Sequence, residues 1–318
     1  MLDSMMIIEL AYIVSAILFI FGLKLLGHPS TARKGNMVSA IGMFIAVIVT
    51  LLDQQIINYQ NLAVGILIGG SIGAWMAKRV QMTSMPQLVS LFNGFGGLAS
   101  LLLGFASVVM TDIANASSAL LLIAYITIII GGVTFSGSLI AWAKLGERMK
   151  TGAIVFAGQR WLYALIMLAA VALGVMVVVQ PFDINVFYVA IGLALVFGIL
   201  ATIPIGGADM PVVISMLNSY SGIAATAAGL AIQNNILIVA GLLVGASGLI
   251  LTQIMCRAMN RSLMNILLSG FAKPVEAGEK ITGEIKVMTA EDSYYVLEAA
   301  QSVVVIPGYG MAVAQAQH

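Results

Sequence analysis

The sequence predicts an all-α polytopic membrane protein of about nine transmembrane helices, followed by a truncated C-terminal α/β segment. The first observation is composition: 61% of the 318 residues are hydrophobic and 8% are charged, whereas soluble domains carry about 25% charged residues. The second is a series of long apolar runs, and the third is the confinement of basic residues to alternate loops. The predicted environment of most of the chain is therefore a lipid bilayer.

The apolar runs are long enough to cross a membrane, because a spanning helix needs about 20 mostly apolar residues. Short polar segments separate the runs. No basic segment precedes the first run, so we expect it to be retained as a helix rather than cleaved as a signal peptide. The runs cover residues 6–26, 36–52, 62–77, 86–109, 119–142, 161–179, 186–205, 210–232 and 235–256.

The basic residues predict the orientation, because Lys and Arg in short loops accumulate on the cytoplasmic side of a membrane. The loops on one side carry Arg33, Lys34, Lys78, Arg79, Lys144, Arg148, Lys150, Arg160, Arg257 and Arg261. The loops on the other side carry Asp53, Asp112, Asp183 and the Asn234-Asn235 turn, without a basic residue. We therefore expect the N-terminus outside and the C-terminus in the cytoplasm.

Charge and cysteine content exclude several classes of function. The net charge is +1 and basic residues occur in ones and twos, so we expect no nucleic-acid partner. The single cysteine, Cys256, excludes an internal disulfide and a Cys-based metal site, and we expect no metal. His28 and His318 lie outside the apolar runs, so no predicted membrane helix carries a histidine.

The chain after the last run changes character, which divides it into three predicted parts. Residues 1–262 form the transmembrane domain, and residues 263–288 form a linker rich in charged residues, Gly and Pro. Residues 289–318 are expected to belong to a soluble domain. Thr289, followed by acidic residues at 291 and 292, predicts the N-terminus of a helix.

The last residues predict the beginning of a nucleotide-binding fold. Residues 302–306 are typical of a buried strand, and Gly308-Tyr309-Gly310 forms a turn that opens a second helix. This order is typical of a Rossmann-like dinucleotide-binding unit, in which a pyrophosphate lies at the helix N-terminus. A parallel sheet needs more strands. We therefore expect the domain to be incomplete and the chain to be a fragment.

Asp209 is a candidate functional residue, because ionisable groups are costly within a membrane and usually have a role there. It lies between the seventh and eighth runs, immediately before Met210-Pro211. The alternative is an N-cap, in which an acidic side chain accepts hydrogen bonds at the start of a helix. The two roles are compatible.

The eighth run carries a polar stripe. Ser215, Asn218, Ser219 and Gly222 have the spacing of one helical face, and Ser221 lies beside them. A polar stripe at the middle of a membrane helix must face protein or water. The alternative to a hydrated path is a set of hydrogen bonds that join neighbouring helices.

Three further groups of small and polar residues lie within the runs. Asn93 is the polar residue of a glycine-rich segment of the fourth run, and Thr134 and Ser138 share a face of the fifth. The alternative for these hydroxyls is a bond to their own helix backbone. Gly241, Gly245 and Gly248 in the ninth run predict close helix packing.

Taken together, these segments resemble the β subunit of proton-translocating nicotinamide nucleotide transhydrogenases, over nearly the whole chain. The blocks occur in the same order and with the same spans between them, which makes the resemblance specific. They are Met85-Pro86-Gln87-Leu88-Val89, residues 134–138, residues 205–213, residues 215–222, residues 255–262 and residues 307–317.

The resemblance implies a proton-conducting membrane domain followed by an NADP(H)-binding domain. The implied activity is hydride transfer from NADH to NADP⁺, coupled to inward proton movement across the cell inner membrane. The implied partner is an alpha subunit that binds NAD(H), within a homodimer of alpha–beta units. The residues expected on the proton path or in its coupling are Asn93, Ser138, Asp209, Asn218, Ser221 and Arg261. Those expected at the pyrophosphate are Gly308, Tyr309, Gly310, Met311, Ala312 and Val313.

The chain departs from the family pattern in two respects. Many members carry a histidine, taken as the proton carrier, where this chain has Asn93, which cannot titrate. We therefore expect the partner subunit to supply a histidine from one of its own membrane helices. The family's nucleotide domain also continues beyond the position of His318, so we expect this chain alone to be inactive and to bind NADP(H) poorly.

Two other classes of function fit the helical pattern alone. A secondary transporter or channel would also place polar residues near the midplane of its helices. The glycine turn after a predicted strand argues against this class, as do the segments quoted above. A membrane anchor for a soluble domain would need far fewer spans.

Overall fold

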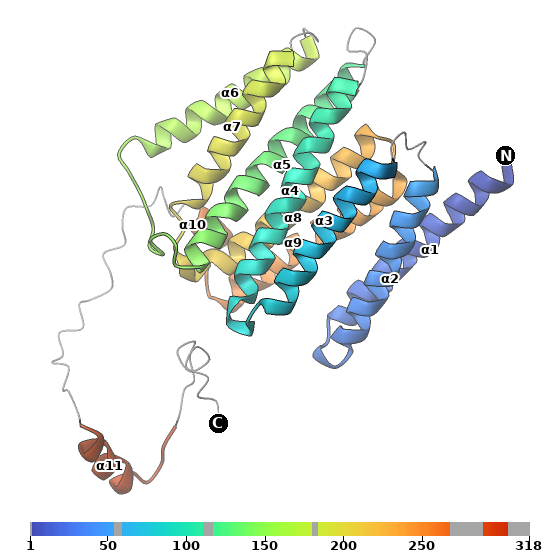
Figure 1. The fold of residues 1–318 in the computed structure, drawn as a ribbon. Helices are drawn as coiled ribbons and strands as arrows, with labels where there is room; N and C mark the ends of the chain where they lie inside the picture. The colour runs from blue at the N-terminus through green and yellow to red at the C-terminus, as the bar shows by residue number, and fades with distance from the viewer. Residues whose placement is uncertain (1, 54–58, 111–116, 180–183, 268–288, 305–318) are drawn as a thin grey trace. The chain divides into compact units, whose positions relative to one another are not determined.

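The computed structural model describes residues 2–53, 59–110, 117–179, 184–267 and 289–304 (Figure 1). The chain divides into two compact units. The first comprises Met1–Val80 and Ser84–Phe271, and the second comprises Gln81–Thr83 and Ala272–His318.

The described residues of the first unit form helices, and nine of these helices are long and apolar enough to cross a bilayer. The predicted series of spans is therefore confirmed in number and order. The nine helices are α1 (Leu2–Leu26), α2 (Pro29–Asp53), α3 (Tyr59–Arg79), α4 (Met85–Met110), α5 (Ser118–Leu145), α6 (Gln159–Val179), α7 (Ile184–Thr202), α8 (Met210–Ala231) and α9 (Asn235–Ala258). Shorter helices are η1 (Met82–Ser84), η3 (Gly207–Asp209) and α10 (Leu263–Leu267).

The second and third helices extend beyond the runs that hydropathy defines. α2 begins at Pro29, whereas the apolar run predicts residue 36 as its start. Proline is tolerated in the first turn of a helix, since the N–H that it lacks would have no partner there. The next two turns of α2 are polar, so hydropathy assigns them to a loop although the backbone is already helical.

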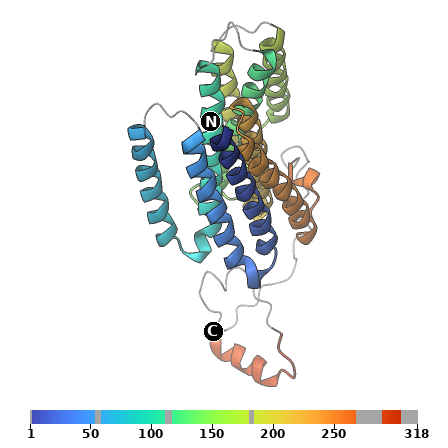
Figure 2. The same cartoon turned by 90° about the vertical axis from the view of Figure 1, so that its right-hand side faces the viewer.

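α5 lies at the centre of the helix bundle and packs against α4, α6, α7 and α8 (Figure 1). α8 in turn packs along α9, and α1 and α2 form a hairpin that meets the bundle through α1 and α9. α3 has no buried residue and stands apart from the other helices in the view of Figure 2.

Glycines allow the central helices to approach closely. A Cβ added to Gly97 of α4 would lie 2.8 Å from the carbonyl oxygen of Gly131 of α5. A Cβ added to Gly222 of α8 would lie 2.3 Å from the backbone nitrogen of Gly245 of α9. Both distances are shorter than a carbon contact allows, so these backbones touch because side chains are absent. The predicted packing role of the glycines in α9 is thereby confirmed.

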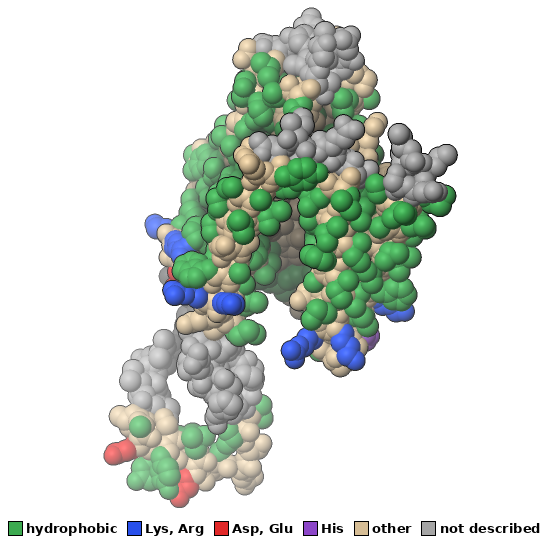
Figure 3. Space-filling view, turned by 45° about the vertical axis from the view of Figure 1, so that its right-hand side comes forward, with side chains coloured by type: hydrophobic (Ala, Val, Ile, Leu, Met, Phe, Trp, Pro, Cys, Tyr) green, Lys and Arg blue, Asp and Glu red, His purple; other side chains and the backbone are tan. Residues whose placement is uncertain are grey.

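The sides of the bundle are apolar, as expected for contact with lipid. Figure 3 shows hydrophobic side chains along the helices and Lys and Arg side chains gathered at one end of them. The exposed apolar side chains include Ile7 at 66%, Phe44 at 66% and Leu168 at 68% exposure. In water such a surface would be unfavourable, whereas in a bilayer it is the expected one.

In the second unit, α11 (Ala290–Ala299) begins as predicted from the sequence. The Thr289 hydroxyl accepts a hydrogen bond from the Asp292 backbone N–H, and the Asp292 carboxylate accepts from Thr289 in return. The hydrogen bonds that the Thr289 side chain and backbone donate to it lower the pKa of the Asp292 carboxyl. This reciprocal arrangement is a capping box.

The predicted α/β segment finds no support in the described residues, which contain no strand. Residues 301–304 form neither helix nor strand, although the sequence predicts a strand from residue 302. A strand is stable only when a neighbour accepts its backbone hydrogen bonds, and the described part of this unit offers none. The predicted glycine turn at Gly308 and Gly310 lies outside the described residues.

Candidate functional site

Asn93 is the centre of a hydrogen-bonded group that joins three helices. Its side-chain Nδ2 donates to the Ser138 hydroxyl of α5 at 2.9 Å. Its Oδ1 accepts a hydrogen bond from the Ser221 hydroxyl of α8 at 2.8 Å. These residues, which the sequence analysis placed on three separate spans, therefore meet in what we call the Asn93 triad.

The surroundings of the Asn93 triad hold α4 and α5 together at this level. The Ser90 hydroxyl, one turn before Asn93, donates to the Ser138 backbone carbonyl at 2.8 Å. Gly94 lets the helices approach, because a Cβ there would lie 3.1 Å from the Ser138 Cβ. Ser138 is 1% exposed and Ser90 is fully buried. The triad is thus a polar group enclosed largely by protein.

Thr134 does not join this group, although it shares a helical face with Ser138. Its hydroxyl donates to the carbonyl of Ile130, one turn earlier in α5, at 2.8 Å. Thr134 is also fully buried. The alternative stated for these hydroxyls, a bond to the backbone of their own helix, therefore holds for Thr134 and not for Ser138.

The polar stripe of α8 divides between two neighbours. The Ser219 hydroxyl donates to the Gly245 carbonyl of α9 at 2.6 Å, and the Ser215 hydroxyl donates to the Gly248 carbonyl at 3.3 Å. Ser215 also accepts from the Thr252 hydroxyl at 3.0 Å. These contacts join α8 to α9, so this side of the stripe is interhelical bonding. Ser221 instead bonds to α4 through the Asn93 triad.

Asn218 lies between these two sides of α8. At 3.6 residues per turn, its side chain is rotated about 60° from Ser215 and about 60° from Ser221. It is half-buried, and its amide makes no hydrogen bond to other described residues. An amide left without a protein partner at mid-helix is free to bind water, which is the property expected of a residue on a hydrated path.

Asp209 forms an ion pair and not the capping hydrogen bond that was its alternative role. It precedes α8, but its φ of −92° and ψ of −3° are helical and its side chain makes no capping hydrogen bond. Asp209 occupies the N-cap position of α8, but the capping hydrogen bond considered as its alternative role is not formed. The Arg261 Nε lies 3.6 Å from Asp209 Oδ1. Pro211 occupies the first turn of α8, as expected.

The Asp209–Arg261 pair connects the start of α8 to the segment that follows α9. The two side chains are 15% and 57% exposed. A pair this exposed contributes about 0–1 kcal/mol to stability, so its main effect is on the relative positions of the two side chains. Arg261 precedes α10, beyond which the chain leads toward the predicted nucleotide-binding segment.

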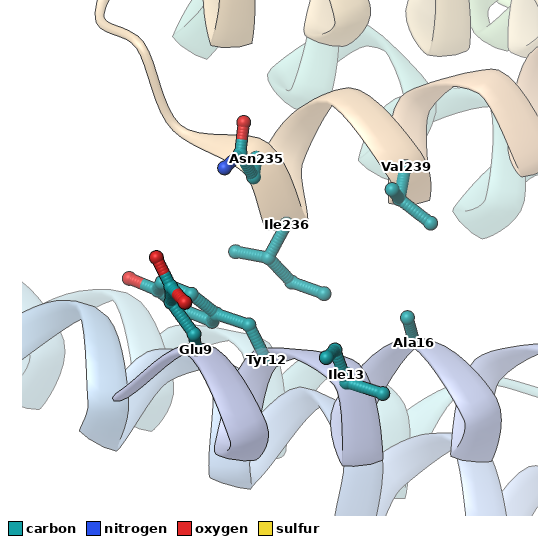
Figure 4. A pocket seen from close by; sticks show the side chains of 7 residues that line it. All are labelled: Glu9, Tyr12, Ile13, Ala16, Asn235, Ile236 and Val239. Atoms are coloured by element: carbon teal, nitrogen blue, oxygen red, sulfur yellow. The ribbon is translucent and has the colours of Figure 1, made fainter. Parts of the chain in front are cut away.

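Two polar residues of the first unit lie where the sequence did not predict them. Glu9, in the first predicted span, lies with Tyr12 beside Asn235 and Ile236 in a groove of about 240 Å³ between α1 and α9 (Figure 4). Lys144 was assigned to a cytoplasmic loop, but it lies in the last turn of α5 and is 1% exposed. The signal for its burial was its position seven residues after Gly137, on the same helical face.

Comparison with known proteins decides the family. A model of the NAD(P) transhydrogenase beta subunit matches residues 8–318. The chain belongs to this family. The NAD(P) transhydrogenase subunit beta of Rhodospirillum rubrum is 42% identical to this chain over an alignment that covers 97% of this chain and 68% of that protein. The subunit from a named strain of the same species matches with the same values.

Membership of the transhydrogenase beta-subunit family confirms the resemblance stated from the sequence. It assigns the chain to a component of an enzyme complex with multi-pass membrane helices. Among the described residues, no three His, Cys, Asp or Glu side chains lie close enough together to hold a metal ion.

Proposed function

We propose that this chain is the proton-conducting membrane part of a proton-translocating transhydrogenase. In this proposal an alpha subunit binds NADH, and the domain to which residues 289–318 belong binds NADP⁺. Hydride passes from NADH to NADP⁺. Protons move inward through the helices of residues 1–262, and residues 263–288 link the two parts. The complete assembly is a homodimer of alpha–beta units in the cell inner membrane.

The observation that carries the proposal is the Asn93 triad, together with membership of the family. Asn93, Ser138 and Ser221 come from three helices and meet where an ordinary membrane core would be apolar. Asn218 adds an amide about one turn from Ser221 without a protein partner among the described residues. Such groups orient water molecules along a path through the bundle, with Asp209 at one end of α8 as the coupling residue.

The proposed orientation places Asp209 and Arg261 at the cytoplasmic mouth. Lys and Arg gather at one end of the helices (Figure 3), and this charge bias is typical of the cytoplasmic side. Asp209 immediately precedes the start of α8 at Met210, and Arg261 follows the end of α9 at Ala258. The Asp209–Arg261 pair therefore lies at the basic end of the helices. The N-terminus is then outside and the C-terminus in the cytoplasm.

The amides of Asn93 and Asn218 do not gain or lose protons, so the path needs a titratable group from elsewhere. We propose that a histidine on a membrane helix of the alpha subunit supplies it, close to the Asn93 triad. The described membrane helices of this chain carry no histidine. The isolated chain is then expected to conduct no protons.

The test is proton flux into proteoliposomes that contain this chain with or without the partner's membrane segment, followed with a pH-sensitive dye. We expect flux only when the partner is present, and only when that segment carries its histidine. A flux through the isolated chain equal to that of the complete complex would overturn the proposal. That result would indicate a water path organised by the asparagines and serines alone.

A further inference from the structure

Lys144 is buried at the end of α5 without an acidic partner among the described residues. It is 1% exposed. Its Nζ donates hydrogen bonds to the backbone carbonyls of Ile205 at 2.7 Å, Ile203 at 2.5 Å and Gly152 at 3.1 Å. We call these four residues the Lys144 cluster. No function described above uses this lysine.

The three hydrogen bonds require the charged form of the side chain. An ammonium group has three N–H donors and no acceptor. A neutral amine has only two N–H groups, so its lone pair would face the third carbonyl and repel it. The ends of α5 and α7 also lie in the cluster, and a cation is favourable at the C-terminus of a helix. The carbonyl dipoles therefore take the place of a carboxylate.

The Lys144 cluster joins two segments that are distant in sequence. Gly152 belongs to the loop of residues 146–158, whereas Ile203 and Ile205 belong to residues 203–209, which we call the α7–α8 junction. Two backbone hydrogen bonds join the same segments: Gly207 N–H donates to the Thr151 carbonyl at 2.8 Å, and Ile154 N–H donates to the Ile203 carbonyl at 3.3 Å.

The α7–α8 junction ends in Asp209, which the Lys144 cluster therefore helps to place. Ile205, whose carbonyl Lys144 holds, is followed by the single turn η3, in which Asp209 N–H donates to the Gly206 carbonyl at 3.0 Å. Asp209 then meets Arg261 at 3.6 Å. The junction is also held by the two backbone hydrogen bonds to residues 151 and 154 and by the buried Ile205 side chain, whereas Gly206 and Gly207 lack side chains and Ala208 is exposed. Loss of the Lys144 hydrogen bonds to Ile203 and Ile205 would loosen the segment that carries Asp209.

We propose that Lys144 is a positioning residue for coupling: its ammonium holds the α7–α8 junction so that Asp209 stays opposite Arg261. This inference rests on the proposed function. Lys144 neither carries protons nor touches nucleotide. It acts through Asp209, and its loss should separate hydride transfer from proton movement while the helices remain assembled.

The test uses the complete alpha–beta complex, with Lys144→Met, Lys144→Gln and Lys144→Arg compared with the unaltered protein. The substitutions remove all, some or none of the donors while the side chain remains long. The readout is the ratio of protons moved to hydride transferred in proteoliposomes. We expect at least a tenfold fall in proton-coupled turnover for Lys144→Met, an intermediate loss for Lys144→Gln, and partial recovery for Lys144→Arg, which keeps the charge.

A second measurement reports on the junction itself. A nitroxide spin label on Ala208→Cys, in a Cys256→Ser background, should give a spectrum of restricted motion with Lys144 and of faster motion with Lys144→Met. Lys150→Met is the matched control, since Lys150 is an exposed lysine of the same loop that makes no ion pair with other described residues. It should change neither the label's motion nor the coupling ratio.

The outcomes separate the two proposals. A complex with Lys144 intact that transfers hydride without moving protons would contradict the proposed function itself. A coupled complex whose ratio and label motion are unchanged by Lys144→Met would overturn only the role of Lys144. If Lys144→Met does not accumulate in the membrane, a Lys144→Gln complex with the unaltered ratio overturns it equally.

Discussion

Gly222 offers the sharpest test of how closely α8 and α9 pack. In Gly222→Ala, the added Cβ would lie 2.3 Å from the Gly245 nitrogen and 2.7 Å from the Gly241 carbonyl oxygen. Both atoms are backbone, so neither can rotate away as the end of a flexible side chain would. Ordinary carbon contacts lie at about 3.5 Å or more, so α8 and α9 must separate by about 1 Å.

The expected cost follows from what this separation removes. Overpacking a tight interface costs about 1–3 kcal/mol. The Ser219 and Ser215 bonds to carbonyls of α9, now 2.6 and 3.3 Å long, would also stretch, and each contributes about 0.6 kcal/mol in a membrane. We expect Gly222→Ala to destabilise the bundle by about 2–4 kcal/mol, roughly a 30- to 1,000-fold change in the folding equilibrium.

The assay is equilibrium unfolding of the detergent-solubilised chain by increasing SDS, followed by far-UV circular dichroism. Gly245→Ala is the control from the same interface, since its Cβ would lie 3.5 Å from Ile223, an ordinary contact. Alanine favours a helix by up to about 1 kcal/mol relative to glycine, so Gly245→Ala should be neutral or slightly stabilising. Equal SDS midpoints for Gly222→Ala and the unaltered chain would refute this account of the packing.

Three further predictions concern function. Asn218→Leu in the complete complex should abolish proton-coupled turnover. It should leave the SDS midpoint nearly unchanged, because the Asn218 amide has no partner among the described residues. Full coupled activity in this variant would show that Asn218 serves only in helix packing. Asn93→Leu should lower both coupled turnover and the SDS midpoint, since it leaves the Ser138 hydroxyl without its donor and the Ser221 hydroxyl without its acceptor. The expected loss of stability is about 1–3 kcal/mol, and an unchanged midpoint would contradict this prediction. Gly310→Val in a complete nucleotide domain should weaken NADP(H) binding strongly, measured by calorimetry, because a side chain would obstruct the pyrophosphate; unchanged affinity would remove the turn from the site.

The spans and the start of α11 could be predicted from the sequence, because they depend on residues close together in the chain. The apolar runs set the number and order of the long helices. Thr289 and Asp292 determine the start of α11, since they lie three residues apart and bond to each other. Gly241, Gly245 and Gly248 indicated a packing face, because their spacing alone aligns them on one side of α9.

The partners of the polar residues could not be predicted in the same way. The spacing of Ser215, Asn218 and Ser219 shows that they are near one another on α8, but not which neighbouring helix each one meets. Asn93 and Ser221 are 128 residues apart, and their bond depends on how α4 and α8 are rotated and tilted within the bundle. A rotation of α8 by about 100°, the angle between successive residues, would exchange one set of contacts for another.

The membrane class, the succession of helices and the family of this protein followed from the sequence, since the length of an apolar run, the capping box of α11 and a short sequence motif are properties of neighbouring residues. Tertiary structure alone decided that Asp209 pairs with Arg261 rather than capping α8, and that Lys144 is buried rather than in a loop. The physical reason is that a charged side chain selects its partner after the helices have packed. Its alternatives near the end of a helix differ by only about 1 kcal/mol, and the packing of distant segments decides between them.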